Sequence, residues 1–153
     1  MRLLLDTTYF LPIIGISVKN LPKDAPTKLM RKEHQIFISD ITIFELAAKG
    51  ATYAASGLIP PERISKGIRA LIYNETIKIL PIHESTILHT AFKLGNILSD
   101  FIDCLILSSA INNCDALITE DNDIQNIKED KDLQEIITIK NPKFQVLKLA
   151  EIL

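Results

Sequence analysis

Short apolar runs alternate along this chain with longer segments whose apolar residues recur at helical spacing, and this alternation most constrains the fold. The runs are typical of buried strands and lie at residues 3–5, 36–38, 77–80, 116–118 and 136–139. The segments with helical spacing cover residues 41–49, 61–73, 83–94, 101–112 and 123–129. This order predicts an α/β fold, a three-layer α/β/α sandwich with a central, mostly parallel sheet.

Composition is that of one ordinary globular domain, and we expect a single domain over residues 1–153. The chain is 47% hydrophobic and 24% charged, and its size suffices for a core without disulfides or a structural metal. Cys104 and Cys114 follow no CxxC or Cys/His pattern, so we interpret them as reduced thiols in the core. We find no signal peptide and no run of about 20 apolar residues, and we expect a cytoplasmic protein without a membrane partner.

Charge is distributed unevenly along the chain. The net charge is −2, but residues 100–135 contain ten acidic residues and two lysines, which leaves the remainder basic. An acidic zone in a basic remainder suits a cation site that faces a polyanion, although solvated helix faces give the same count. Residues 15–32, with two prolines and a glycine, predict a mobile basic excursion, whose basic residues are Lys19, Lys23, Lys28, Arg31 and Lys32.

Four carboxylates fall where parallel sheets bind ligands, at the carboxyl ends of strands and the starts of nearby helices. Asp6 directly follows the run at residues 3–5, and Asp121 follows the run at 116–118. Glu45 lies in the helix after the second strand, and Asp103 lies in the first turn of the helix before the fourth strand. Carboxylates gathered in apolar surroundings repel one another unless a cation or protons intervene. Their joint position therefore indicates a site for a hard divalent ion such as Mg²⁺ or Mn²⁺.

Each of these acids also has an ordinary structural explanation. Asp6 can cap a helix that begins at Thr7, and Glu45 can pair with Lys49 one turn later. The remaining acids can act as helix caps or turn residues, namely Asp100 with Asp103 in an analogue of a capping box, and Asp121 with Asp123.

At these positions the chain resembles the PIN domain, a nuclease family that includes the VapC-type toxins of bacterial and archaeal toxin–antitoxin pairs. The similar segments are LLLDTTYF (3–10), ITIFEL (41–46), DFIDCLILSSA (100–110) and CDALITEDNDI (114–124). No single segment is specific, but all four occur in the order of the family and span most of the chain.

The resemblance implies a divalent-metal-dependent endoribonuclease that hydrolyses phosphodiester bonds and leaves a 5′-phosphate and a 3′-hydroxyl. The implied catalytic and metal-binding residues are Asp6, Glu45, Asp103 and Asp121. Thr119 and Thr8 are implied to order the site, and Asp100 and Asp123 are accessory candidates. The resemblance also implies an antitoxin protein as a partner and a homodimer, which we expect to form through the helices of residues 52–73.

Basic residues on one predicted helix are candidates for contact with RNA. Arg63, Lys66 and Arg69 recur at every third position, which places them on neighbouring parts of a helix flank. Such cations position phosphates without reading sequence, although a solvated helix face is the commoner role of each. Aromatic residues make up only 6% of the chain, and Tyr9 is the best candidate for stacking on a base.

Three other functions compete with this interpretation. A phosphorylated receiver domain is disfavoured because no aspartate ends the third predicted strand, although Lys140-Asn141-Pro142 faintly resembles its lysine element. A haloacid-dehalogenase phosphatase would require a second aspartate where Thr8 stands. The remaining alternative is a catalytically silent PIN-like module that binds or assembles proteins.

Overall fold

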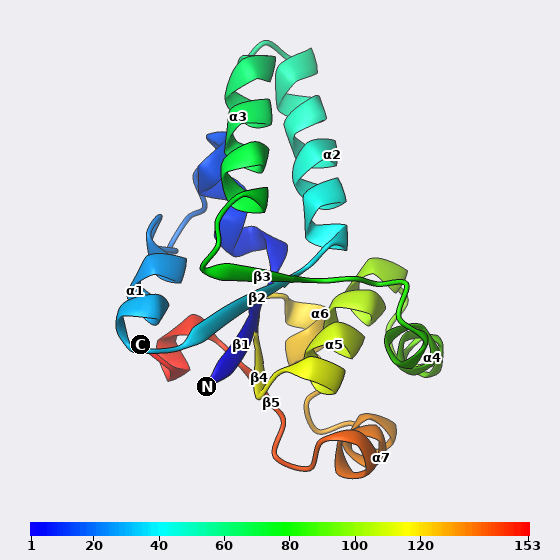
Figure 1. The fold of residues 1–153 in the computed structure, drawn as a ribbon. Helices are drawn as coiled ribbons and strands as arrows, with labels where there is room; N and C mark the ends of the chain where they lie inside the picture. The colour runs from blue at the N-terminus through cyan, green and yellow to red at the C-terminus, as the bar shows by residue number, and fades with distance from the viewer.

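One five-stranded sheet runs through the computed structural model, which describes all 153 residues (Figure 1). Its strands are β1 (Arg2–Leu5), β2 (Gln35–Ser39), β3 (Ile77–Leu80), β4 (Ala116–Ile118) and β5 (Gln145–Leu147). All neighbouring strands are parallel, and their order is β3-β2-β1-β4-β5. The predicted α/β/α architecture is confirmed, with a sheet that is parallel throughout.

Helices cover both faces of the sheet. One face carries the 3₁₀ helices η1 (Thr7–Ile14) and η2 (Leu149–Glu151) with α1 (Ala25–Arg31), α2 (Ile41–Ala55) and α3 (Pro61–Ile72). The other face carries α4 (Ser85–Leu94), α5 (Phe101–Asn113), α6 (Asn122–Asn126) and α7 (Lys131–Lys140). No helix is both long and apolar enough to cross a lipid bilayer.

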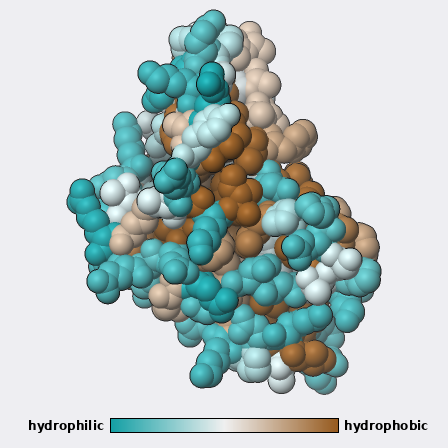
Figure 2. Space-filling view, in the orientation of Figure 1, coloured by the Kyte–Doolittle hydropathy of each residue, from teal (hydrophilic) through white to brown (hydrophobic).

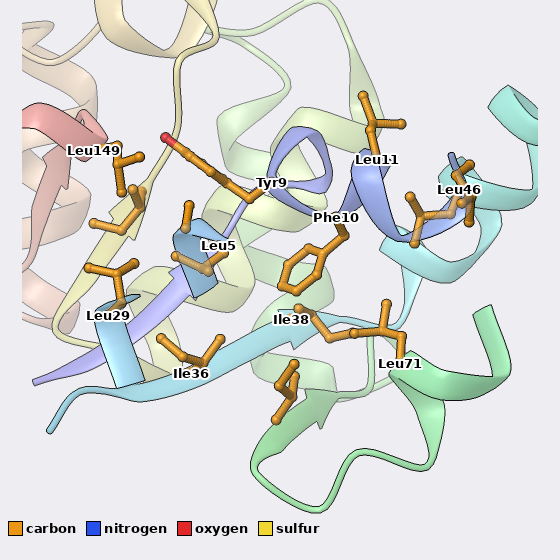
Figure 3. Packing of buried hydrophobic residues seen from close by; sticks show 14 of the residues in the cluster. Leu5, Tyr9, Phe10, Leu11, Leu29, Ile36, Ile38, Leu46, Leu71 and Leu149 are labelled. Carbon is orange, nitrogen blue, oxygen red and sulfur yellow. The ribbon is translucent and has the colours of Figure 1, made fainter. Parts of the chain in front are cut away.

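Alternating side chains of the central strands enter two separate apolar clusters, which explains why the middle of each of these strands is an unbroken apolar run. Leu3 and Leu5 pack into the cluster under η1, α1, α2 and α3, and Leu4 packs into the cluster under α4, α5 and α7. Figure 3 shows Phe10 of η1 lying close to Ile38 of β2 within the first cluster. Strands buried on both faces are what a covered parallel sheet requires.

Helices α2 and α3 form a hairpin that projects from the sheet (Figure 1). Two glycines permit its close packing: a Cβ on Gly50 would clash with Ile64 across the hairpin, and one on Gly67 would clash with the Ile13 carbonyl of η1. Glycine at these positions therefore lets α3 approach both α2 and η1. The predicted helices of residues 41–49 and 61–73 correspond to this hairpin, and α2 continues further, to Ala55.

The fifth predicted strand, at residues 136–139, is wrong, because these residues belong to α7. Asp130 caps this helix by accepting hydrogen bonds from the backbone N–H groups of Asp132 and Leu133. Leu133 and Ile137 are buried one turn apart, whereas Ile139 is 74% exposed, which is helical rather than strand periodicity. The fifth strand is instead β5, which follows Asn141 and Pro142.

Residues 15–32 are not a structureless excursion. They contain α1, whose Ala25 and Leu29 are fully buried in the core, so this segment is anchored to the sheet. The last predicted helix, over residues 123–129, is shorter in the structure, where α6 ends at Asn126. Cys104 and Cys114 are free and buried, as predicted.

Candidate active site

The strand order reverses beside β1, and this reversal places the candidate site. The chain builds β1, β2 and β3 outward in one direction and then returns to add β4 on the other side of β1. Leu5 of β1 pairs with Ile118 of β4, so the residues that follow these two strands, Asp6 and Thr119, become neighbours. Ligands of parallel sheets bind outside the carboxyl ends of strands at such a reversal.

Asp6 is the most enclosed acid of the site, with 8% of its surface exposed. One oxygen of its carboxylate accepts a hydrogen bond from the Thr7 backbone N–H at 2.7 Å, and the other accepts one from the Thr119 hydroxyl at 2.6 Å. Burial raises the pKa of Asp6, and these two hydrogen bonds oppose that shift. Asp6 thus caps η1, and the hydroxyl of Thr119 orients its carboxylate.

Glu45 extends from the second turn of α2 toward β1. Its carboxylate accepts a hydrogen bond at 2.5 Å from the hydroxyl of Thr7, which also lies 3.2 Å from the Thr42 hydroxyl. Burial raises the pKa of Glu45, and the Thr7 hydrogen bond acts against this shift. The structure contains no ion pair between Glu45 and Lys49, so the alternative explanation of Glu45 as the partner of Lys49 is wrong.

Asp103 lies in the first turn of α5, among the other acids of the site. Its burial, followed by the negative charges of neighbouring carboxylates, raises the pKa of Asp103 to about 7. The carboxylates that contribute are, in order of effect, those of Asp121, Asp100, Asp6 and Glu45. The carboxylate of Asp103 is therefore close enough to the other three candidate acids, and to Asp100, for their charges to change its pKa.

Asp121 and Asp100 both cap helices at the edge of the site. Asp121 accepts a hydrogen bond from the Ile124 N–H at the start of α6, and Asp100 accepts one from the Ile102 N–H at the start of α5. The hydroxyl of Thr119 accepts a hydrogen bond from the Asp121 N–H while it donates to Asp6, so Thr119 ties the two acids together. The ordering role expected of Thr119 agrees with this geometry. Asp123 is exposed in the first turn of α6.

The acidic set suits a hydrated divalent cation better than a closed metal cage. As they stand, no three His, Cys, Asp or Glu side chains lie close enough together to hold a metal ion by themselves, so a bound ion would need water molecules or substrate oxygens as further ligands. At the same time, none of the three ion pairs of the protein involves Asp6, Glu45, Asp103 or Asp121, and the only nearby cation, Lys49, lowers the pKa of Glu45 without forming an ion pair. Oxygen donors that hold a cation partly through water molecules are typical of Mg²⁺.

Of the two threonines after β1, Thr7 makes side-chain hydrogen bonds within the site. Thr7 is buried and contacts Glu45, whereas the Thr8 side chain makes no hydrogen bond. Thr7 and Thr8 are adjacent and chemically identical, and only the backbone of η1 makes the Thr7 side chain point toward Glu45. The sequence alone therefore did not identify Thr7. The 3₁₀ geometry of this segment decides the direction, and the sequence pattern had suggested only a helix start.

Tyr9 is buried and is not available to stack on a base. Its hydroxyl donates a hydrogen bond at 3.0 Å to the carboxylate of Glu120, which also accepts one from the Leu149 N–H. In Figure 3 the Tyr9 hydroxyl points toward the segment that carries Leu149. Tyr9 thereby connects η1 to η2, and the expectation of a stacking role is wrong.

The basic residues expected on α3 are exposed and divide between two surfaces. Lys66 and Arg69 line a shallow cavity of about 240 Å³ along α3. Arg63 instead donates a hydrogen bond to the Ile13 carbonyl at 3.2 Å and lines a second cavity, of about 170 Å³, with Lys23. The structure therefore places one cation of residues 15–32 beside a cation of α3.

Two solved structures share this fold. VapBC2 from Rickettsia felis, solved with a DNA fragment from its promoter, is 20% identical over 97% of this chain and 98% of that chain, with a TM-score of 0.60. A toxin–antitoxin complex from Klebsiella pneumoniae is 21% identical over 82% of this chain and 92% of that chain, with a TM-score of 0.57. At these identities the likeness shows a common fold.

Family membership is shown by the sequence itself. Among curated proteins, no sequence matches this chain. The pattern of the PIN domain family, however, matches residues 3–130, a stretch that contains all four acids. This protein therefore belongs to the PIN domain family of nucleases.

Proposed function

We propose that this protein is a divalent-metal-dependent endoribonuclease whose centre comprises Asp6, Glu45, Asp103 and Asp121. The observation that carries the proposal is the environment of Asp103, where burial and four neighbouring carboxylates raise the pKa to about 7 with no cationic side chain to compensate. Burying several like-charged carboxylates close together is unfavourable, and residues with pKa values perturbed in this way are typical of functional sites.

The four carboxylates would act as ligands of Mg²⁺ or Mn²⁺. Such an ion supplies neutralisation of phosphate charge and lowers the pKa of a bound water. Asp6 is held rigidly by Thr7 and Thr119, and Glu45 is held by Thr7, so these side chains present oxygens in fixed positions. Because its pKa is about 7, Asp103 is partly protonated near neutral pH, and a cation bound beside it would favour the ionised carboxylate.

Substrate contacts would come from the basic surfaces on the hairpin side. Lys66 and Arg69 on α3, with Arg63 and Lys23 beside Gly15, are placed to bind phosphates of the RNA outside the acidic centre. Contacts of this kind orient the strand and weaken as salt concentration rises. Asp100 and Asp123 border the acids as accessory candidates.

The likeness to toxin–antitoxin structures supports a toxin that an antitoxin protein holds inactive. We propose that the protein forms homodimers and acts in the cytoplasm, where free buried thiols such as Cys104 and Cys114 stay reduced. The alternative function is a catalytically silent PIN domain that binds or assembles proteins. The intact set of four acids favours the nuclease.

Cleavage of a mixed pool of single-stranded RNA tests the proposal. The purified protein is assayed with Mg²⁺, with Mn²⁺ and with EDTA, beside the variants Asp103→Asn and Asp132→Asn. Asp132 is the matched control, because it also lies in the first turn of a helix but is exposed on α7. We expect cleavage in either metal, with 5′-phosphate products, that EDTA and Asp103→Asn abolish and Asp132→Asn leaves unchanged. A folded protein that neither cleaves RNA nor binds Mn²⁺ by calorimetry is the silent module.

A further inference from the structure

Two exposed phenylalanines stack on each other beside the acidic centre. Phe92 of α4 and Phe101 of α5 have ring centroids 5.9 Å apart and ring planes inclined by only 9°. Their exposed fractions are 58% and 45%, so each ring keeps a large surface open to solvent. The His89 ring, one turn earlier on α4, lies 6.5 Å from Phe92. In Figure 2, apolar residues also reach the surface on the side of the molecule where α4 and α5 lie in Figure 1.

The position of this pair connects it to the site. Phe101 begins α5, so it stands directly after Asp100 and in the same helical turn as Asp103. Helices α4 and α5 pack against each other along their length, which fixes Phe92 relative to this turn. Side chains two residues apart in a helix point to different sides, so the Phe101 ring does not face the Asp103 carboxylate. Asp100, directly before Phe101, is one of the charges that raise the pKa of Asp103, so the start of α5 borders the acids, and a nucleotide that adjoins a phosphate at the centre can reach the two rings.

We propose that Phe92 and Phe101 form a platform on which a base of single-stranded RNA stacks, next to the phosphodiester that is cleaved. This inference rests on the ribonuclease function proposed above. The ring planes are nearly parallel and the rings are offset, the geometry in which aromatic groups attract one another. Every base presents a flat π surface, so such a platform binds bases without strict sequence preference. It also selects unpaired RNA, because a base inside a duplex is not free to leave its stack.

A nucleotide suits this surface better than a second protein copy. A stable protein interface buries about 800 Å² on each partner, far more than two partly exposed rings provide. A symmetric contact through Phe101 would also bring Asp100 of one copy toward Asp100 of the other, and like charges repel across an interface. A stacked base needs only one ring face, and its phosphate turns toward the cation at the acids.

Short RNAs with one altered nucleotide test the platform. Wild type and the variants Phe92→Leu and Phe101→Leu are compared on an RNA with natural bases and on RNAs with a single abasic site at either side of the cleaved bond. Leucine keeps the apolar volume and removes the ring. We expect each variant to raise KM about tenfold on the natural RNA and to leave kcat within about twofold. On the RNA that lacks the stacked base, wild type and variants should have the same KM.

A binding measurement separates this inference from the cleavage itself. RNA is prepared with the fluorescent base 2-aminopurine at the same nucleotide. The fluorescence of this base should be quenched when the RNA binds the wild type, and quenched less when it binds either leucine variant. Tyr73→Leu is the control, because Tyr73 is an exposed aromatic residue at the opposite end of β3 from α4. The protein could fail to cleave RNA and still quench the fluorescence only when both rings are present. That result would support the platform and contradict the ribonuclease proposal.

Two outcomes overturn the platform. One is cleavage by the leucine variants with wild-type KM on both kinds of RNA. The other is a dimer by light scattering that Phe92→Leu and Phe101→Leu convert to monomers without any change in quenching, which assigns the rings to contact between copies.

Discussion

The hydroxyl of Thr7 lies 2.5 Å from the carboxylate of Glu45, and the two residues come from different elements on the same face of the sheet. This hydrogen bond connects the end of β1 to the second turn of α2. Because Thr7 has one hydroxyl proton and gives it to Glu45, the Thr42 hydroxyl at 3.2 Å is left to donate to Thr7. Thr7 therefore positions one acid through its side chain and another, Asp6, through its backbone N–H.

Thr7→Val should separate positioning from folding, because valine keeps the shape of threonine and loses the hydroxyl. We expect Mn²⁺ affinity by calorimetry and kcat for RNA to fall about 10- to 100-fold, as is usual when a hydrogen bond that orients a metal ligand is removed. Thr7→Ser should restore most of both. Thr8→Val is the control, since the Thr8 hydroxyl has no hydrogen-bond partner in the protein. Equal losses in both valine variants would show that the Thr7 hydrogen bond is unimportant.

Asp103→Asn should make the metal-free protein more stable while it abolishes cleavage. The raised pKa of Asp103 means that folding forces its charged form into an unfavourable environment. An uncharged amide removes that cost, and we expect the free energy of unfolding at pH 8 to rise by about 2 kcal/mol after solvent screening. Urea unfolding in EDTA measures it. An unchanged or lower stability of Asp103→Asn would contradict the pKa assigned to Asp103.

The stability of the metal-free wild type should fall as pH rises from about 4 to about 8. Because the pKa of Asp103 is raised from 3.8 to about 7, the folded state binds more protons than the unfolded state between these values. Stability then decreases with pH and levels off above pH 7. Burial raises the pKa values of Asp6 and Glu45 in the same direction. Thermal unfolding in EDTA across this range should show the slope, and Asp103→Asn should make it shallower.

Gly67→Ala should loosen the hairpin from η1. A Cβ at this position would lie 2.8 Å from the carbonyl carbon of Ile13 and closer still to its oxygen, and backbone cannot move aside easily. The gain in helix propensity, about 1 kcal/mol, should be outweighed, and we expect a net loss of about 1–2 kcal/mol in urea unfolding. Ser65→Ala, exposed on the same helix, should be neutral.

The sequence predicted most of the fold because its central strands are short and wholly apolar. Residues 3–5, 36–38 and 116–118 each belong to strands in the middle of the sheet, since a parallel sheet covered on both faces leaves no polar position in its centre, and residues 77–80, with Lys78, form the edge strand β3. Residues 136–139 misled because an apolar run of four residues fits a strand or a helix equally well. The cap by Asp130 and the spacing of Leu133 and Ile137 decide for the helix.

The candidate site was predictable in its acids and less so in its surroundings. Strand ends and helix starts placed Asp6, Glu45, Asp103 and Asp121 near one edge, and the pKa of Asp103 reflects their charges. The direction of a side chain within a 3₁₀ turn cannot be obtained from periodicity, which is why the role of Thr7 was missed and Tyr9 was expected to stack on a base. The pairing of Phe92 with Phe101 depends on how α4 crosses α5, and the sequence does not specify that angle.

Because β4 comes late in the sequence, the four acids can come together only after most of the chain has been synthesised. The hydrogen bond between Thr119 and Asp6 joins residues 113 positions apart, and Asp121 follows only after that. A ribosome that has not yet translated β4 carries a chain with Asp6 and Glu45 but without Asp121, and fragments released early share this deficiency. Incomplete translation products of this gene would therefore lack a complete set of acids, because the last of the four follows the strand that is added on the other side of β1.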